Sequence, residues 1–176
     1  MTIVPQPPAA SPAPAVPGPR WEPRLYPGTL ATTSRVRSDL RTDLGRLAGI
    51  EPDLVETVVL CASEMFANAV EHSRSGEEDG RVIRSLAVPA ASLAGAALRL
   101  SIIDDGARVF RPRIPRQRTR EEWQEAERGR GLLLLDHLAT AWGARRVVDF
   151  PFCEGLGTVI WAEFALAPAS SPGDGR

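Results

Sequence analysis

The clearest pattern of hydrophobic and polar positions runs over Glu56–His72, where residues of one kind recur every three or four positions. This spacing predicts a helix with one buried face. Pro52 suits the first turn of the helix, because a missing N–H costs nothing there. Glu64 and Asn68 stand four residues apart, so their side chains meet on the opposite, polar face. The apolar positions expected in the core are Val55, Val58, Val59, Ala62, Met65, Phe66, Ala69 and Val70.

A shorter helix is predicted before this segment, beginning near Thr33 or Ser34 and ending at Gly49. Its outer face mixes arginines with aspartates, which is typical of a solvated surface; a docking surface for an acidic partner is the alternative. The inward positions are Val36, Leu40, Leu44 and Leu47, and the outer positions are Arg35, Arg37, Asp39, Arg41, Asp43 and Arg46.

The remaining segments read mostly as strands. Trp21–Tyr26 is limited to a short edge strand by its prolines, whereas Arg81–Val88 and Leu98–Ile103 alternate apolar and polar residues. The other predicted elements are a helix over Leu132–Trp142 and strands over Val147–Phe150 and Thr158–Leu166. Sequential strands with short connections predict a two-layer α/β sandwich, in which a mixed, mostly antiparallel sheet carries helices on one face.

The two ends of the chain differ from this folded part. Residues 1–20 contain seven prolines among alanines and have no apolar periodicity, so we expect a disordered, proline-rich tail. Residues 168–176 read in the same way. The folded domain is therefore expected over residues 21–167. Within it, residues 107–130 carry eight arginines and four glutamates without a regular pattern, and a loop of this length is either functional or disordered.

Composition excludes several classes of function. The 21 basic residues are all arginine, which excludes a Walker-type phosphate loop because that loop needs a lysine. They balance 22 acidic residues, so we expect no direct binding of nucleic acid. Cys61 and Cys153 are too few for a disulfide framework or a zinc site. Without a signal-like leader or a membrane-spanning run, the expected location is the cytoplasm, with no membrane partner.

Four short motifs carry candidate chemistry when they are taken together. They are Glu64 with Asn68 on the long helix, Asp104-x-Gly106 at a strand end, Gly129-x-Gly131 before a helix, and Gly157-Thr158 before a strand. Each motif alone is weak, since a glycine-containing turn is ordinary turn chemistry. Their joint presence in this order is much harder to explain by chance.

In this combination the chain resembles the Bergerat-type (GHKL) ATPase superfamily, which includes the ATP domains of gyrase, heat-shock chaperones and histidine kinases. The resemblance covers about Trp21 to Leu166. The phrases SEMFANAVEHS, IIDDG, GRGLLLLDHLATAWG and GTVIWAEF are most similar to the anti-sigma-factor serine kinases and related actinobacterial ATP-binding regulators.

The resemblance implies a role for each motif. Asn68 matches the asparagine that coordinates magnesium, for which an amide oxygen is a suitable hard ligand. Glu64 matches the general base that accepts a proton from an attacking hydroxyl. Asp104 matches the aspartate that accepts a hydrogen bond from the adenine amino group, and Gly106 lets the base approach the backbone.

The other implied positions surround the phosphates and the base. Backbone N–H groups at the two glycines would face the phosphates at a helix N-terminus, with arginines beside them, and the arginine-rich loop matches a mobile lid. The residues concerned are Arg128, Gly129, Arg130, Gly131 and Leu132, with Thr158 near the adenine. His72 also fits the family's pattern but receives no mechanism, and packing is the expected role of Cys61.

The function that the resemblance implies is an Mg²⁺- and ATP-dependent protein serine/threonine kinase that regulates transcription as an anti-sigma factor. Its partners would be a sigma factor and an anti-sigma-factor antagonist that it phosphorylates. The alternative is a nucleotide-gated binding module without significant kinase activity. No histidine-bearing helix pair is recognised upstream of this domain, which argues against a complete sensor histidine kinase. The oligomeric state stays open, although homodimers are usual among proteins of this family.

Overall fold

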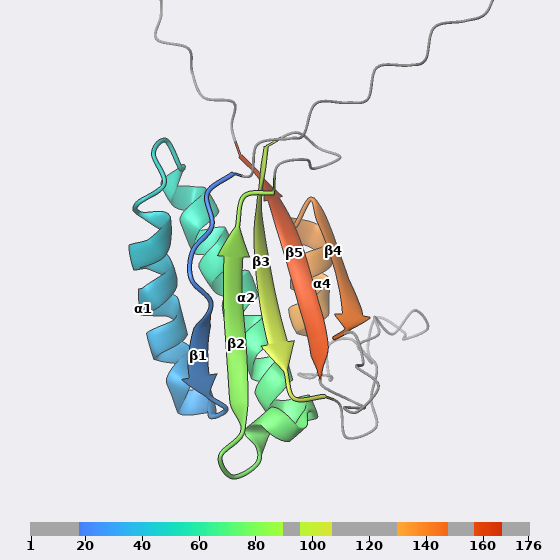
Figure 1. Cartoon of the computed structure of the whole chain (residues 1–176). Coiled ribbons are helices and arrows are strands. Elements are labelled where there is room, and N and C mark those ends of the chain that lie inside the picture. The colour runs from blue at the N-terminus through green and yellow to red at the C-terminus, as the bar shows by residue number, and fades with distance from the viewer. Residues whose placement is uncertain (1–17, 90–95, 107–129, 148–156, 167–176) are drawn as a thin grey trace, which may run out of the picture.

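A five-stranded sheet with helices on one face forms the protein in the computed structural model (Figure 1). The structure describes residues 18–89, 96–106, 130–147 and 157–166. Along the chain its elements are β1 (Arg24–Pro27), η1 (Leu30–Thr32), α1 (Thr33–Leu44), α2 (Pro52–His72), η2 (Arg74–Gly76), β2 (Arg81–Ala87), β3 (Ala97–Asp104), α4 (Arg130–Leu138), β4 (Ala141–Arg146) and β5 (Thr158–Ala165). The predicted α/β sandwich is thereby confirmed.

The strands lie in the order β1-β2-β3-β5-β4, and every neighbouring pair is antiparallel. β1 is an edge strand, as its prolines predicted. Residues 1–17 of the predicted tail lie outside the described residues. Arg20 pairs with Ala87, the last residue of β2, and the carbonyl of Pro19 accepts a hydrogen bond from the N–H of Val88, which follows it.

The helix α2 lies across the middle of the helical layer, behind β2 and β3 in Figure 1. Its predicted apolar face is confirmed, because the side chains facing the sheet are buried. The buried residues of α2 are Val58, Val59, Cys61, Ala62, Met65, Phe66 and Ala69. Cys61 therefore packs in the core. Burial, and to a smaller extent the nearby charge of Glu64, raises the pKa of its thiol to about 11.

Two helices end earlier in the sequence than predicted. α1 ends at Leu44 instead of near Gly49. α4 ends at Leu138, and Trp142 belongs to the strand β4, which occupies Ala141–Arg146 instead of the predicted Val147–Phe150; residues 148–150 lie outside the described residues.

The reason for the second error is a long-range hydrogen bond. The apolar residues continue through the end of α4, so hydropathy gives no sign of a boundary. The N–H of Ala139 still donates to Leu135 within the helix, but the next N–H, of Thr140, donates to the carbonyl of Glu163 at 2.8 Å. Pairing with β5 therefore replaces the helix from Thr140 onward.

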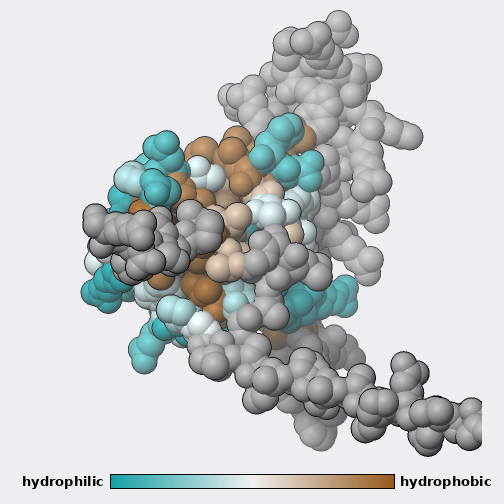
Figure 2. Space-filling view, turned by 90° about the horizontal axis from the view of Figure 1, so that it is seen from above, coloured by the Kyte–Doolittle hydropathy of each residue, from teal (hydrophilic) through white to brown (hydrophobic). Residues whose placement is uncertain are grey.

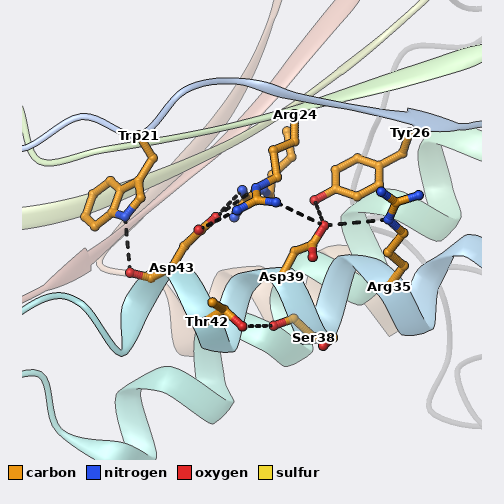
Figure 3. A network of polar contacts seen from close by, with 9 residues as sticks. Trp21, Arg24, Tyr26, Arg35, Ser38, Asp39, Thr42 and Asp43 are labelled. Carbon is orange, nitrogen blue, oxygen red and sulfur yellow. Dashed lines mark hydrogen bonds and ion pairs between the residues drawn. The ribbon is translucent and has the colours of Figure 1, made fainter.

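Polar residues hold α1 against the sheet in Figure 3. Asp43 was predicted on the outer face of α1, but its carboxylate is buried and faces the sheet. It accepts hydrogen bonds from Nε and Nη2 of Arg24, at 3.2 and 2.7 Å, and from Nη2 of Arg84. Arg84 is fully buried on the core side of β2. A charge in the core needs a partner of opposite charge, and Asp43 supplies it.

A second carboxylate completes this network. Asp39 accepts a hydrogen bond from the hydroxyl of Tyr26 at 3.0 Å and lies 3.6 Å from Nη1 of Arg24. The indole N–H of Trp21 donates to the backbone carbonyl of Asp43 at 3.1 Å. The edge strand and the segment before it are thus attached to α1 through side chains as well as through the sheet.

Hydrophobic residues run along the middle of the view in Figure 2, which looks onto the upper end of the molecule, and hydrophilic residues lie at its margins. Among the described residues, no helix is both long enough and apolar enough to cross a membrane.

We expect Asp43→Asn to lower the free energy of unfolding by about 3–5 kcal/mol, because the buried guanidinium of Arg84 loses its charged partner. The matched control is Glu56→Gln, which breaks an exposed bidentate pair with Arg41 and should cost much less, because water screens exposed charges. Urea unfolding measured by circular dichroism compares the two variants. Equal costs would contradict the importance of the buried pair.

Acid should weaken the same network. Burial raises the pKa of Asp43, but the hydrogen bonds from Arg24 and Arg84 together lower it below the ordinary value of 3.8. A lowered carboxyl pKa stabilises the fold fully above pH 3.8, and this contribution is lost as the pH falls through the lowered value. Unfolding measured between pH 6 and pH 2 should therefore show a steeper acid loss in the wild type than in Asp43→Asn.

Candidate functional site

The polar face of α2 presents the first predicted pair. Glu64 and Asn68 are both half-buried and lie one helical turn apart. The apolar face of the same helix is fixed in the core, so the backbone that carries this pair has little freedom to move. A carboxylate and an amide are thus held side by side at the edge of the core.

The first turn of α4 lies directly against this pair. A Cβ atom placed on Gly131 would be 3.0 Å from Nδ2 of Asn68 and 3.0 Å from Oε2 of Glu64. A side chain at this position would be tight against both residues, so glycine suits the close approach of the helix. Leu132 and Leu135 are buried and anchor the helix in the core. The structure therefore brings Gly131 and Leu132 together with Glu64 and Asn68, as the sequence predicted.

This arrangement places a helix N-terminus over a possible metal ligand. The N–H groups of the first turn have no partner within the helix and carry partial positive charge, which favours phosphate oxygens. Arg128 and Gly129 lie outside the described residues, and so does the side chain of Arg130. The arginine contacts and the lid predicted over residues 107–129 remain predictions.

The second group of site residues forms the turn after β3. One carboxylate oxygen of Asp104, Oδ1, accepts hydrogen bonds from the N–H of Gly106 at 2.8 Å and the N–H of Thr158 at 3.1 Å. Gly106 has φ of 90°, a conformation that favours glycine. The structure thus joins the Asp104-x-Gly106 motif to the beginning of β5, which are far apart in sequence.

The carboxylate of Asp104 is almost completely buried. Burial raises its pKa above the ordinary value, the two backbone hydrogen bonds act in the opposite direction, and the charge of Asp105 raises it slightly. A carboxylate that is poorly hydrated gains more from a new hydrogen-bond donor than one in water. Asp104 is therefore well suited to accept a hydrogen bond from a ligand.

Gly157 allows this junction to form. A Cβ atom at this residue would lie 1.8 Å from the carbonyl oxygen of Asp104, and its φ is 131°. Neither the space nor the backbone conformation tolerates a side chain. The Gly157-Thr158 motif is thus explained by the close approach of two backbones, and the side chain of Thr158 is half-buried beside it.

The described residues of the site could supply only some of the ligands that a magnesium ion needs. Among the described residues, no group of three or more histidine, cysteine, aspartate or glutamate side chains is placed to bind a metal ion. Mg²⁺ normally takes one or two protein ligands and completes its shell with phosphates and water. Asn68, beside the helix N-terminus, fits this requirement.

Sequence reasoning missed the residues that hold the Asp104 turn. Ser75 and Arg74, in the turn after α2, make hydrogen bonds to Asp105 and Gly106. The segment was read only as a polar turn. Its one sequence signal is the repeated serine around Arg74, since Ser73 and Ser75 are well placed to bond nearby backbone groups. His72 is exposed, with a ring nitrogen 4.0 Å from Glu71.

The comparisons with known proteins agree with this fold. A family model described as histidine kinase-like ATPase domain matches residues 26–161, which include all the predicted site residues. The chain is similar in fold to a crystal structure of the RsbU and RsbW domains of Rv1364c from Mycobacterium tuberculosis, with 22% identity and a TM-score of 0.52. That match covers 85% of this chain and 34% of the other. No curated protein shows significant sequence similarity to the chain.

We expect Gly157→Ala to lower the free energy of unfolding by several kcal/mol, because a new Cβ would meet the backbone of Asp104. Gly49→Ala is the matched control. Gly49 also has positive φ, at 75°, but nothing lies within 4 Å of the added atom, so only the conformational cost of about 1–2 kcal/mol remains. Equal losses in urea unfolding would show that the contact with Asp104 is unimportant.

Proposed function

The chain belongs to the histidine kinase-like ATPase domain family, and on this premise we propose that it is an Mg·ATP-dependent protein serine/threonine kinase that also acts as an anti-sigma factor. Its partners would be a sigma factor, which it sequesters, and an antagonist protein, which it phosphorylates. The observation that carries the proposal is the contact of Gly131 with both Glu64 and Asn68. It supports a single site in which base, metal ligand and phosphate cradle act on one nucleotide.

The proposed division of roles follows from the two ends of the site. Asp104 accepts a hydrogen bond from the adenine amino group through Oδ2, because Oδ1 already accepts two backbone N–H groups. Gly106 and Thr158 lie against the base. At the other end, the N–H groups near Gly131 and Leu132 bind phosphate oxygens, assisted by Arg128, Gly129 and Arg130.

Mg²⁺ held through Asn68 would neutralise phosphate charge when it is bound. Glu64 accepts the proton from a serine hydroxyl of the substrate as that oxygen bonds to the γ-phosphorus, and ADP leaves. Most of the rate enhancement in such a reaction comes from positioning and charge stabilisation. A site with one base, one metal ligand and a backbone cradle is sufficient for it.

Three features support the regulatory part of the proposal. The sequence phrases of the domain are similar to those of anti-sigma-factor kinases, and the fold is similar to one that includes an RsbW domain. The outer face of α1 exposes Arg35 and Arg37, and Arg46 is exposed just after its end, which suits an acidic partner surface. We propose that the domain extends over residues 21–167, with proline-rich tails outside it, and that it acts in the cytoplasm.

A second candidate, a nucleotide-gated binding module, shares the same site. It would use the same contacts with the nucleotide but would not need Glu64 as a base. Purified protein incubated with labelled Mg·ATP and candidate partners separates the two functions. Transfer of label to a partner serine supports the kinase, and ATP-dependent co-elution without transfer supports the module.

For the kinase, we expect Glu64→Gln to keep its affinity for ATP but to transfer phosphate about 10²–10⁴ times more slowly, because the base is removed. Glu71→Gln, an exposed carboxylate on the same helix, is the control and should behave as the wild type. The measurement is single-turnover label transfer at saturating ATP. Unchanged transfer in Glu64→Gln would remove Glu64 from the mechanism.

For the metal, we expect Asn68→Ala to lose the gain in ATP affinity that Mg²⁺ gives the wild type. The loss should be about 10–100-fold, comparable to one hydrogen bond with a charged group. Calorimetric titration with ATP, in Mg²⁺ and in EDTA, measures it. If the variant and the wild type respond to Mg²⁺ equally, Asn68 is no ligand.

A further inference from the structure

The turn η2 connects the two halves of the site. It follows directly after α2 and lies against the Asp104–Gly106 turn. The N–H of Asp105 donates to Oγ of Ser75 at 2.9 Å, and the N–H of Arg74 donates to the carbonyl of Gly106 at 3.1 Å. The guanidinium of Arg74 donates to the carbonyl of Asp105 from Nε at 3.1 Å and from Nη2 at 2.8 Å.

Ser75 is itself held from the helix side. Its N–H donates to Oγ of Ser73 at 3.0 Å, and that hydroxyl donates to the carbonyl of Ala69 at 2.6 Å. Ser73 and Ser75 are both buried. A chain of hydrogen bonds therefore runs from Ala69, the residue after Asn68, to the backbone of the Asp104 turn.

The surrounding backbone leaves Ser75 no room to move. A Cβ atom on Gly80 would lie 2.2 Å from the carbonyl oxygen of Ser75, and one on Gly28 would lie 1.6 Å from it. In addition, the N–H of Arg81 donates to Oδ2 of Asp105 at 3.3 Å. The hydroxyl of Ser75 is thus held in place, and it holds the Asp104 turn through its hydrogen bond with the N–H of Asp105.

We propose that Ser75, assisted by Arg74, is a positioning residue that sets the orientation of the Asp104 carboxylate and thereby the selectivity of the site for a base with an exocyclic amino group. This inference rests on the proposed function. Neither residue touches the ligand. Both act through the backbone of Asp105, which is bonded covalently to Asp104.

The geometry explains why selectivity depends on this contact. Oδ1 of Asp104 is fixed by the N–H groups of Gly106 and Thr158, so the direction of Oδ2 depends on how the turn is rotated. Hydrogen bonds weaken steeply as their angle departs from linear. A site built to accept a hydrogen bond discriminates strongly against an analogue that lacks the donor, but only if the acceptor is correctly aimed.

The test compares ATP with inosine triphosphate, which carries a carbonyl oxygen in place of the adenine amino group. Calorimetry gives the ratio of the two affinities for the full chain in Mg²⁺. We expect Ser75→Ala to reduce the ratio about 3–10-fold, mainly by weakening ATP binding. Arg74→Ala should reduce the ratio less. Because Arg74 is exposed, this variant should fold even if Ser75→Ala does not.

The matched control is Ser63→Ala. Ser63 lies on the same helix, but its hydroxyl donates only within the helix, to the carbonyl of Val59 at 2.8 Å. Its ratio should equal that of the wild type. A wild-type ratio in folded Ser75→Ala and in Arg74→Ala would overturn the inference.

Amide hydrogen exchange separates this inference from the proposed function. The Asp105 N–H should exchange roughly tenfold faster or more in Ser75→Ala, with or without nucleotide. Unchanged exchange overturns the anchoring role of Ser75 whatever the nucleotide data show. A wild type that binds no Mg·ATP overturns the proposed function and the selectivity role together. Equal binding of both nucleotides overturns the selectivity role and the proposed contact of Asp104 with the adenine amino group. In either case the faster exchange still identifies the anchor.

Discussion

The backbone of α2 is the common support for both ends of the site. Glu64 and Asn68 project from its middle, and the turn that begins at Ser73 holds the Asp104 loop at its end. Asn68 and His72, the last residue of α2, are four residues apart, which is about 6 Å along the helix. Because the opposite face of α2 is buried in the core, the spacing of the two ends is held by the packing of the helix. A ligand that contacts both ends meets a site whose length is already set.

The glycines of the site show how one motif can satisfy two physical requirements. The sequence suggested that Gly131 frees backbone N–H groups for phosphate. The structure adds that the missing side chain of Gly131 also lets α4 lie close to Glu64 and Asn68. Gly157 likewise lets β5 begin against the carbonyl of Asp104. Close packing of the backbone is therefore a second requirement that these glycines meet, beside the exposed N–H groups suggested at Gly131.

How much the sequence could predict depended on whether the determining contacts were local. The long helix, its Pro52 start and its buried face follow from spacing along one segment and were predicted correctly. The Asp104 turn was also visible, since a carboxylate before glycine is a local signal. The end of α4 was missed because it is decided by Glu163, more than twenty residues away. The role of Ser75 was missed for the same reason, since its partner, Asp105, is thirty residues further on.

The partner of Arg84 in the core, Asp43, is also far away in the sequence. Alternation places Arg84 between Val82 and Leu86 on the buried side of β2, where a charge is costly unless it is paired. Nε and Nη1 of Arg84 have no hydrogen-bond partner among the described residues, so the pair with Asp43 is not an optimal source of stability. An apolar pair of similar volume would stabilise a core at least as well. What the ion pair adds is direction: only one rotation of α1 brings Asp43 to Arg84, and that rotation turns Arg35 and Arg37 outward. The buried charge therefore fixes which surface of α1 faces outward.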